Sequence, residues 1–595
     1  MYKIVKDLIA LLSPDQAKML WRLQFLIVVA ACLETISVMS IAPFMGLVVD
    51  MSLLDSMPLL AKFSSYFNIF EPKMIVTFVG FGVIALLTVS SIVSMVTLWR
   101  LSVFGARFGM ELGDRLFTLY MTEEWLFHTK NNTSDLVKQI SEDSLRVSDN
   151  LITPLLLINA RIAVCFLIVL GMMLFNPLIA LGGVAILVCA YICIYVFLKV
   201  RLIANAITVT EMSAKRFRIM FEGFTSIRDV ILRSNYDYFI NRFCLSGREL
   251  AKARGNNLAL AITPRYLMEL VVFGSLVLLL LFIVNDGRGS LMSSLPTLAF
   301  FGFAVFRLMP GLQQIYASLA QVRGNEYAFT SIKDDLNRAS LKISALEKKI
   351  EGNIDLKIKV NNKISLKDVC FKYPEQSKLA LDSISLDIVK GEILGIVGDS
   401  GSGKSTLGDL LLGLISPLSG EMVVDSEDVD SMNLARWRNS VGYVPQTVSL
   451  LDTSFLENIA FGVEDAEIDH AAVEGAITAS DLDSLISSNP SGVSGGVGEG
   501  GILLSGGQRQ RVALARSLYA ESQLIVFDEA TSALDAGTQE RVMQSILKLK
   551  QNAAIVLITH SHATLDFCDK ICLMSDGHLI DFGPTTEVTL RHDRF

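Results

Sequence analysis

Charged residues are scarce in this 595-residue sequence, and neither sign strongly predominates. Asp, Glu, Lys and Arg together make up 19% of the residues, whereas hydrophobic residues make up 51%. Soluble globular domains usually contain about 25% charged residues, so this composition argues against a wholly soluble protein and against a disordered chain. The formal net charge of −8 provides no basic surface for nucleic acid. We therefore expect no nucleic-acid partner.

Cysteines are also few, and they are widely spaced. The eight cysteines form neither the paired pattern of a zinc site nor the dense framework of a small disulfide-rich domain. Half of them lie in apolar runs: Cys32, Cys165, Cys189 and Cys193. We expect all eight to be reduced thiols.

Long hydrophobic runs, in contrast, dominate the first half of the chain. A helix needs about 20 predominantly apolar residues to cross the hydrocarbon core of a bilayer. Residues 1–21 mix Lys and Asp into an amphipathic pattern without a small-residue cleavage site, so we expect an interfacial helix and no cleaved signal peptide. Six later stretches are predicted to span the membrane: Leu23–Val49, Met74–Leu98, Leu151–Phe175, Pro177–Leu198, Leu258–Val284 and Leu295–Val322.

The basic residues between these stretches predict the orientation. Lys and Arg resist translocation, and most of those in the first half lie in segments 99–150 and 199–257. We therefore expect both segments, the amino terminus and everything after Val322 to be cytoplasmic, with the chain integral to the cell (inner) membrane. Each segment exceeds 50 residues, too long for a simple connector. Helix signals such as Ser134 predict that the helices extend beyond the bilayer.

Five charged residues lie inside the predicted spans or at their margins: Glu34, Arg161, Arg265, Glu269 and Arg307. An ionised group near the bilayer centre costs about 2.5 to 3.5 kcal/mol, so each needs a partner or a water-filled cavity. Arg265 and Glu269 are four residues apart and can pair on one helix face, which leaves a structural and a functional role open. Arg307 has no carboxylate at helical spacing, which favours a role in a cavity.

The second half of the chain has a different pattern. Residues 326–362 are charged and lack apolar runs, so we predict a linker there, between a transmembrane domain at 1–325 and a soluble domain at 363–595. In the soluble domain, apolar strands alternate with helices, which is typical of an α/β domain with a mainly parallel sheet. The predicted fold class is a multidomain membrane protein, with an all-α six-helix domain followed by an α/β domain.

A glycine-rich segment early in this α/β domain predicts a phosphate-binding loop. It follows the strand-like ILGIV and opens the helical STLGDLLLGL, which is the context that a P-loop requires. In such a loop the backbone N–H groups surround the phosphates at a helix amino terminus, the lysine adds a positive charge, and the hydroxyl after it binds Mg²⁺. We therefore predict ATP and Mg²⁺ as ligands. The segment consists of Gly398, Asp399, Ser400, Gly401, Ser402, Gly403, Lys404, Ser405 and Thr406.

Two later strands end in side chains suited to nucleotide hydrolysis. SQLIVFDE ends in Asp528 and Glu529, and AAIVLITH ends in His560. Adjacent carboxylates beside a P-loop fit Asp528 as a ligand of Mg²⁺ and Glu529 as the group that polarises the attacking water. On its own, His560 is more often a structural histidine.

A second glycine-rich segment, LLSGGQRQR, precedes another helix. Ser505, Gly506 and Gly507 offer a hydroxyl and backbone donors at a helix start, which is a second potential anion site. One domain has no obvious need for two such sites, whereas two copies facing head to tail would use both. The sequence therefore predicts a homodimer.

Together these motifs resemble those of ABC transporters of the exporter type, in which membrane and nucleotide-binding domains are fused. The resemblance extends over essentially the whole chain. It implies that Tyr373 in CFKYP stacks on adenine and that Gln446 in YVPQ senses Mg²⁺ and the membrane domain. It also implies that the signature Ser505–Gln508 completes the partner's ATP site, that Asp535 links the two sites, and that His560 contacts the γ-phosphate.

Other segments resemble the regions of this family that make contacts between the membrane domain and the ATPase domain. VGEGG around Glu499 is similar to an exporter loop that touches the cytoplasmic helices, although Gly500 stands where an arginine is usual. FHTKNNTSDLVKQISEDS and FEGFTSIRDVILRSNYDYF are similar to the two intracellular loops whose coupling helices dock on the ATPase. Because no motif is degenerate, the resemblance favours a homodimer with two hydrolysing sites.

Within this family, spans one, five and six resemble bacterial flippases of lipid-linked oligosaccharides. That resemblance implies that Arg265 and Arg307 line a cationic cavity for the lipid pyrophosphate, although the arginine expected in the second span is absent. We therefore expect ATP-driven export or flipping of a lipid-linked oligosaccharide or related glycolipid. An exporter of lipid, drug or peptide is an alternative, as is a non-transporting ATP-gated channel or sensor. Glu529 and His560 favour turnover over a switch.

Overall fold

The computed structural model of the chain describes residues 2–49, 72–175, 177–286, 291–350, 357–530 and 536–592. The chain divides into two compact units. The first consists of Met1–Glu123 with Lys130–Glu347, and the second of Glu124–Thr129 with Lys348–Phe595. The first unit is helical and the second contains both helices and sheets, which confirms the predicted fold class.

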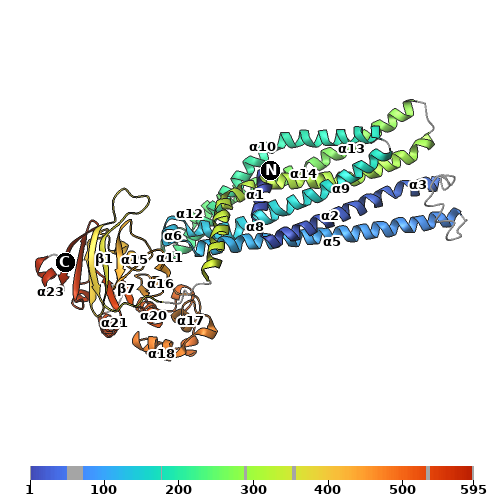
Figure 1. Ribbon diagram of the computed structural model, residues 1–595. Helices are drawn as coiled ribbons and strands as arrows, with labels where there is room; N and C mark the ends of the chain where they lie inside the picture. The colour runs from blue at the N-terminus through green and yellow to red at the C-terminus, as the bar shows by residue number, and fades with distance from the viewer. Residues whose placement is uncertain are drawn as a thin grey trace. The chain divides into compact units, whose positions relative to one another are not determined.

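The axes of the long helices of the first unit lie nearly parallel to one another (Figure 1). Local signals fix the start of α2, because the Ser13 side chain accepts from the Gln16 N–H while the Gln16 side chain accepts from the Ser13 N–H. The elements are α1 (Tyr2–Ala10), α2 (Pro14–Met39), α3 (Ile41–Val49), α5 (Pro72–Met121), α7 (Thr133–Lys138), η2 (Gln139–Asp143), α8 (Ser144–Val147), η3 (Ser148–Ile152), α9 (Thr153–Phe175), α10 (Pro177–Thr225), α11 (Ile227–Arg233), α12 (Tyr236–Ile262), α13 (Pro264–Asp286) and α14 (Leu291–Ile350).

The predicted spans lie on these helices. Four helical stretches of the described chain are long and apolar enough to cross a membrane: Pro14–Val48, Met74–Met121, Thr133–Leu174 and Ala180–Thr225. They cover most of each of the first four predicted spans. The fifth and sixth predicted spans fall on α12, α13 and α14. Pro264 divides the fifth between two helices, because proline lacks the N–H that would continue α12.

The surface of these helices is suited to lipid. Only 11% of the most apolar window is buried in both Met74–Met121 and Ala180–Thr225. Large apolar side chains such as Phe81, Phe166 and Phe197 are exposed. Contiguous apolar surface of this extent is unstable in water, and a bilayer would cover it.

Two small apolar clusters pack the helices together, and α14 contributes to both. In one, Ala31 of α2 and Ile168 of α9 pack with Leu308. In the other, Tyr191 of α10 and Met268 of α13 pack with Tyr316. The two clusters therefore join different sets of helices to the same helix, α14.

Close packing between α5 and η3 depends on small residues. A Cβ atom at Gly109 would lie 2.2 Å from the Ser148 Cβ, so only glycine fits there. The Ser148 Oγ donates to the Gly105 carbonyl at 2.8 Å. The stretch η2–α8–η3 that packs here is unusual, because two π-helical segments flank one α-helical turn.

The second unit contains two sheets, and only one of them was anticipated. The six-stranded sheet has the order β10-β9-β3-β8-β7-β6, with all strands parallel except β10. The other sheet is antiparallel, with the order β2-β1-β4-β5. The strands are β1 (Lys363–Phe371), β2 (Leu381–Val389), β3 (Ile393–Gly398), β4 (Ser419–Val424), β5 (Glu427–Asp428), β6 (Val441–Val444), β7 (Leu524–Asp528), β8 (Ala554–Ile558), β9 (Lys570–Ser575) and β10 (His578–Pro584).

Alternate residues of the parallel strands face two different cores. Ile525 and Phe527 of β7 pack in one cluster, and Leu524 and Val526 pack in the other. Burial on both faces explains why these strands are almost continuously apolar in sequence. The remaining helices are α6 (Trp125–Lys130), α15 (Lys404–Leu411), α16 (Leu434–Arg438), α17 (Phe455–Ile459), α18 (His470–Ala479), α19 (Asp483–Ser488), α20 (Gly506–Tyr519), α21 (Ala536–Leu549), α22 (His562–Leu565) and α23 (Thr585–Arg591), with short 3₁₀ turns η4 (Asp465–Glu467), η5 (Gly492–Ser494) and η6 (Glu499–Gly501).

The segment 326–362, predicted as a linker, begins as helix. α14 continues without a break to Ile350, and Ala328, Phe329 and Ile332 are buried on it. Their spacing of one, three and four residues gives this charged stretch an apolar helical face.

Candidate nucleotide-binding site

The loop between β3 and α15 has a backbone that only glycine accommodates at two positions. Gly398 has φ 147° and Gly403 has φ 100°, and both values fall where side chains are disfavoured. A Cβ at Gly398 would lie 2.1 Å from the Met574 carbonyl oxygen, and one at Gly403 would lie 2.6 Å from the Ala380 carbonyl oxygen. The predicted P-loop is therefore held tightly against neighbouring backbone.

Lys404 is the first residue of α15, and it is buried. Its Nζ donates to the carbonyl oxygens of Gly398 at 2.8 Å and Asp399 at 2.7 Å. Burial lowers the pKa of Lys404, whereas the charges of Glu529, Asp399 and Asp528 act in the opposite direction. A buried ammonium group of this kind gains stability from a phosphate group bound in the same loop.

The ends of β6, β7 and β8 bring three predicted residues together: Gln446, Glu529 and His560. Glu529 follows β7, and its Oε1 lies 3.0 Å from the Nε2 of His560. Gln446 Nε2 donates to Glu529 Oε2 at 2.7 Å. Because parallel strands present their carboxyl ends at one edge, the sheet order β3-β8-β7 places these groups beside the P-loop.

Asp528 lies in a more enclosed position than its neighbour. Burial raises the pKa of Asp528, and the Glu529 carboxylate adds to that shift. The Tyr443 hydroxyl donates to Asp528 Oδ2 at 3.4 Å. A divalent cation bound at Asp528 would favour its ionised form.

The chemistry of the residues fits Mg²⁺ held jointly by protein and nucleotide. Ser405 and Asp528 supply oxygen atoms at the same edge of the sheet, and Mg²⁺ in nucleotide sites takes few protein ligands and completes its shell with phosphates and water. In the described ranges no group of three or more His, Cys, Asp or Glu side chains could hold a metal ion by itself.

A cavity of about 350 Å³ lies over the P-loop. Predicted residues that line it are Tyr373, Ser400, Gly401, Gly403, Lys404, Ser405, Thr406, Glu529 and His560. The Tyr373 hydroxyl lies 3.2 Å from the Thr406 Oγ1, and its ring packs edge-on against Phe371. Tyr373 therefore stands at the border of the cavity, where an adenine ring could reach it.

The lining also includes residues that the sequence did not single out: Gln376, Lys378, Leu379, Ala380, Asp576 and Gly577. Gly577 N–H donates to the Ser402 carbonyl at 3.0 Å, and Lys378 pairs with Asp576 at 2.8 Å. The Asp576-Gly577 dipeptide between two apolar strands is a hairpin signal. Nothing in that local signal says that the hairpin supports the P-loop.

The signature segment forms the start of α20. The Ser505 Oγ accepts from the Gln508 N–H at 3.3 Å, and the Gln508 side chain accepts from the Ser505 N–H at 2.7 Å. This capping box leaves Ser505 exposed. None of Ser505, Gly506, Gly507 and Gln508 belongs to the lining of the P-loop cavity, and Asp535 lies outside the described residues.

Two features of the second unit bear on the implied contacts between domains. Residues 124–129 belong to this unit, where Leu126 packs against the core and the Trp125 side chain hydrogen-bonds to Asp409. Burial raises the pKa of Asp409 to about 6, and the Asp528 charge contributes. Glu499 begins the turn η6, in which Gly500 has φ 59°.

The predicted substrate residues lie in the first unit. Arg265 Nε donates to Glu269 Oε1 at 3.0 Å, so the pairing anticipated from the four-residue spacing is present. Arg307 lies on α14, but its side chain lies outside the described residues. Of the other intramembrane charges, Arg161 Nη1 lies 4.0 Å from Glu34 Oε2.

Comparisons with known proteins agree with this geometry. Residues 381–532 match the ABC transporter family. The chain is 38% identical over 221 residues to an ATP-dependent lipid A-core flippase of Ralstonia nicotianae, a match that covers 37% of each chain. It is 36% identical over 232 residues to ABC transporter B family member 13 of Arabidopsis thaliana, covering 39% of this chain and 18% of that protein. In these relatives the match thus spans well under half of their length.

The fold extends the similarity to the whole chain. The solved structure of a bacterial Atm1-family ABC exporter with ATP bound superimposes with a TM-score of 0.78, covering 97% of each chain at 19% identity. At that identity the likeness concerns the fold alone. The second unit therefore contains an ABC transporter domain, and the chain has the fold of an exporter-type half-transporter.

Proposed function

We propose that this chain, an exporter-type half-transporter by fold with an ABC transporter domain, hydrolyses ATP to move a phosphate-bearing glycolipid across a membrane. The observation that carries the ATPase part is the contact set around Glu529. His560 and Gln446 both reach its carboxylate at hydrogen-bonding distance, beside a P-loop lysine. A carboxylate with only a structural role would not need two polar side chains to contact it at the edge of the cavity.

Different residues have different roles in ATP hydrolysis. The P-loop N–H groups and Lys404 bind the β- and γ-phosphates. Glu529 orients the attacking water and accepts its proton, and Gln446 and His560 hold that carboxylate in place. Ser405, Asp528 and Gln446 are the residues that would hold Mg²⁺, which when bound would neutralise charge at the phosphate oxygens. The water oxygen bonds to the γ-phosphorus as the bond to ADP breaks.

The substrate class follows from shared chemistry. Several relatives are described as lipid A-core flippases, and the sequence resembles flippases of lipid-linked oligosaccharides. Both kinds of substrate are amphipathic glycolipids with phosphate groups. Exposed apolar helices in the first unit suit a protein that receives its substrate from the bilayer.

Two copies of the chain would form the working transporter. The exposed Ser505 at the start of α20, away from the P-loop cavity of its own chain, suits contact with nucleotide bound to a second copy. The ATPase unit and the amino terminus are proposed to lie in the cytoplasm and the helices in the cell membrane, and the basic segments 99–150 and 199–257 support this orientation. A homodimer then contains two composite ATP sites.

Reconstitution tests this function. The purified chain in liposomes is expected to hydrolyse ATP, to be stimulated by lipid A or by a polyprenyl-pyrophosphate oligosaccharide, and to move a labelled form of that lipid between leaflets. Glu529→Gln serves as the matched inactive control. Absence of hydrolysis in the wild type would refute the ATPase assignment, and hydrolysis that never exceeds the basal rate with either lipid would refute the glycolipid assignment.

A further inference from the structure

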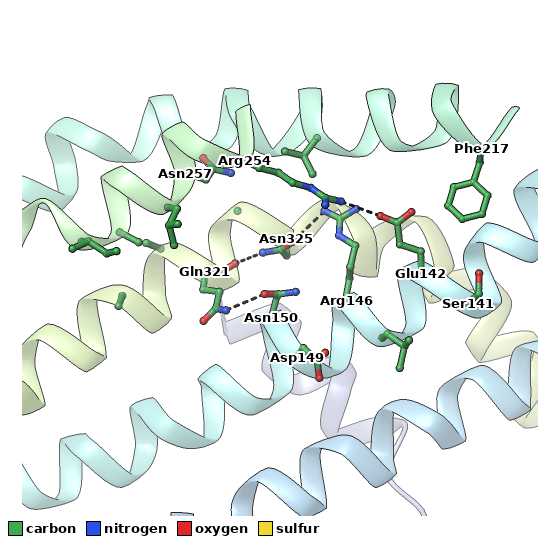
Figure 2. Close-up of a pocket in the computed structure, with 18 residues that line it drawn as sticks. Ser141, Glu142, Arg146, Asp149, Asn150, Phe217, Arg254, Asn257, Gln321 and Asn325 are labelled. Carbon is green, nitrogen blue, oxygen red and sulfur yellow. Dashed lines mark hydrogen bonds and ion pairs between the residues drawn. The ribbon is translucent and has the colours of Figure 1, made fainter. Parts of the chain in front are cut away.

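A cavity of the first unit lies where the predicted fifth span begins and the predicted sixth span ends, and Arg265 is not among the residues that line it. It has a volume of about 760 Å³, within the range of about 300 to 1,000 Å³ typical of ligand sites. Its walls come from the segment η2–α8–η3 and from α10, α12 and α14 (Figure 2). On the predicted topology this is the cytoplasmic boundary of the membrane.

A row of polar side chains converges on this cavity. Gln321 Nε2 donates to Asn150 Oδ1 at 2.9 Å, and Asn325 Nδ2 donates to the Gln321 carbonyl at 2.8 Å. Arg146 Nη2 donates to Asn325 Oδ1 at 3.1 Å. Figure 2 shows these side chains pointing toward one another from the helices on either side. Arg146 is therefore held in a fixed position by an amide network.

Part of this network has no hydrogen-bond partner within the described chain. The Arg146 side chain is only 9% exposed, and its Nη1 lies 3.7 Å from Asp143 Oδ1, which is beyond hydrogen-bonding distance. Asn257 Oδ1, also in the cavity wall, is buried and equally unpartnered. Arg146 Nη1 is ion-paired with Asp143 but makes no hydrogen bond, and a buried donor without a hydrogen bond is costly, so an oxygen atom of a ligand would stabilise it.

The four charged residues that line the cavity, Glu142, Arg146, Asp149 and Arg254, sum to zero net charge, so any excess positive charge lies in the buried residues behind them. Lys138 Nζ lies 2.6 Å from Asp143 Oδ2, so the nearest carboxylate is already paired with another cation. Arg254 also lines the cavity, is bound to Glu142 at 3.3 Å, and is close enough for its charge to act on Arg146. Asp149 is the other acidic residue in the wall, and it is exposed. The buried set Lys138, Asp143 and Arg146 thus carries one net positive charge.

The local backbone is also specialised. Arg146 lies in the single α-helical turn α8 between the π-helical segments η2 and η3. Such π-helical turns are rare and occur frequently at functional sites. The close contact of η3 with Gly109 of α5 holds the backbone of this segment in place.

From these observations we infer that Arg146 and Arg254 form a binding subsite for the phosphate group of a lipid, with the amides of Asn257 and Gln321 available for the hydroxyls of its head group. A head group held here would lie at the membrane boundary, with its acyl chains against the exposed apolar helices. This subsite rests on the proposed function and adds to it a loading position distinct from Arg265 and Arg307.

Binding measured without nucleotide tests the subsite. Native mass spectrometry of the full-length protein would compare bis-phosphorylated lipid A with the same lipid stripped of phosphate. The wild type is expected to bind the phosphorylated form at least about tenfold more tightly, the size of a single charge-assisted contact. Arg146→Gln and Arg254→Gln should lose that preference. Arg146→Lys should recover part of it, because it keeps the charge without the bidentate fork.

Arg248→Gln is the matched control, because Arg248 is exposed on the same helix as Arg254 but does not line the cavity. It should bind like the wild type. If Arg146→Gln proves unstable, the 56%-exposed Arg254 still provides a variant that folds. A preference that persists in Arg254→Gln and in every folded Arg146 variant overturns the subsite, as does a wild type without preference. Inorganic phosphate that displaces the lipid at equal concentration would assign the site to the free ion instead.

The outcomes separate the two proposals. A wild type that prefers the phosphorylated lipid but does not hydrolyse ATP keeps the subsite and refutes the transport function. A wild type that transports a glycolipid without any phosphate preference in binding keeps the function and refutes the subsite.

Discussion

Glu529 has a strained backbone at the point where its side chain is most constrained. Its φ is 49°, in the left-handed region, a conformation that costs a residue other than glycine about 1 to 3 kcal/mol. Its N–H donates to the Ile558 carbonyl at 2.9 Å, which ties this turn to β8. The carboxylate is thereby aimed at His560 and Gln446. Strain retained at such a position is consistent with catalysis.

If Glu529 activates the water, Glu529→Gln should bind ATP with unchanged affinity but hydrolyse it at least about 10²-fold more slowly, the scale of losing a general base. Equilibrium binding of a fluorescent ATP analogue and steady-state ATPase measurements would test this. Glu474→Gln, an exposed glutamate on α18, is the control and should be fully active. Near-normal turnover in Glu529→Gln would show that another group activates the water.

Asp409 predicts a pH dependence of stability. Its pKa of about 6 in the folded protein exceeds the value of about 3.9 of an unfolded chain. The folded state therefore binds more protons between these values, and this carboxyl lowers stability as pH rises from about 4 to above 6. Asp409→Asn, which stays neutral, should raise the melting temperature relative to wild type more at pH 7.5 than at pH 4.5.

Thermal unfolding followed by intrinsic fluorescence at both pH values would measure this difference. Asp452→Asn, at an exposed aspartate, is the control and should behave alike at the two pH values. A gain for Asp409→Asn that is equal at both, or larger at pH 4.5, would show that Asp409 does not titrate with a raised pKa.

Among the elements, α13 and α14 carry the two arginines that the resemblance assigns to substrate. Because Arg265 is paired with Glu269 on its own helix, its presence in the membrane unit has a structural explanation as well as a functional one. The two explanations differ in what they require of Glu269. A structural pair needs both partners, whereas a substrate contact needs only the arginine.

We predict that Arg265→Ala and Arg307→Ala keep basal ATPase activity and lose lipid-stimulated hydrolysis and transport, whereas Glu269→Gln keeps transport. Arg307→Lys should recover part of the function. Transport of labelled lipid in liposomes, with ATPase assays on the same samples, would measure these effects. An equal loss of transport in Arg265→Ala and Glu269→Gln would show that the pair is structural. Normal transport in both alanine variants would show that the arginines do not belong to the substrate site.

At the scale of the whole molecule, the separation of the P-loop from the signature predicts shared sites. Lys404→Ala disables the P-loop, and Ser505→Arg disables the signature. A dimer of the two variants contains one composite site built only from intact parts. Each variant alone should be inactive, and the purified mixed dimer should regain up to about half of wild-type ATPase activity, since it has one intact site of two.

Co-expression with two affinity tags and ATPase assay of the doubly purified dimer would test this arrangement. Ser505→Ala is a milder control, because it removes the cap of α20 at a cost of about 1 kcal/mol without placing a bulky charge at the interface. No recovery in verified mixed dimers would contradict head-to-tail sharing.

The sequence by itself determined the parts whose physics is local. The P-loop glycines, the helix start at Ser505 and the apolar runs each act within a few residues, so their residue types are readable in order along the chain. Tertiary structure decided which distant parts meet. That Gly577 supports Ser402, that Gln446 and His560 both reach Glu529, and that Arg146 and Arg254 share one cavity all depend on sheet order and helix packing. Such contacts join residues far apart in sequence, and their energies depend on burial and distance, which no local pattern encodes.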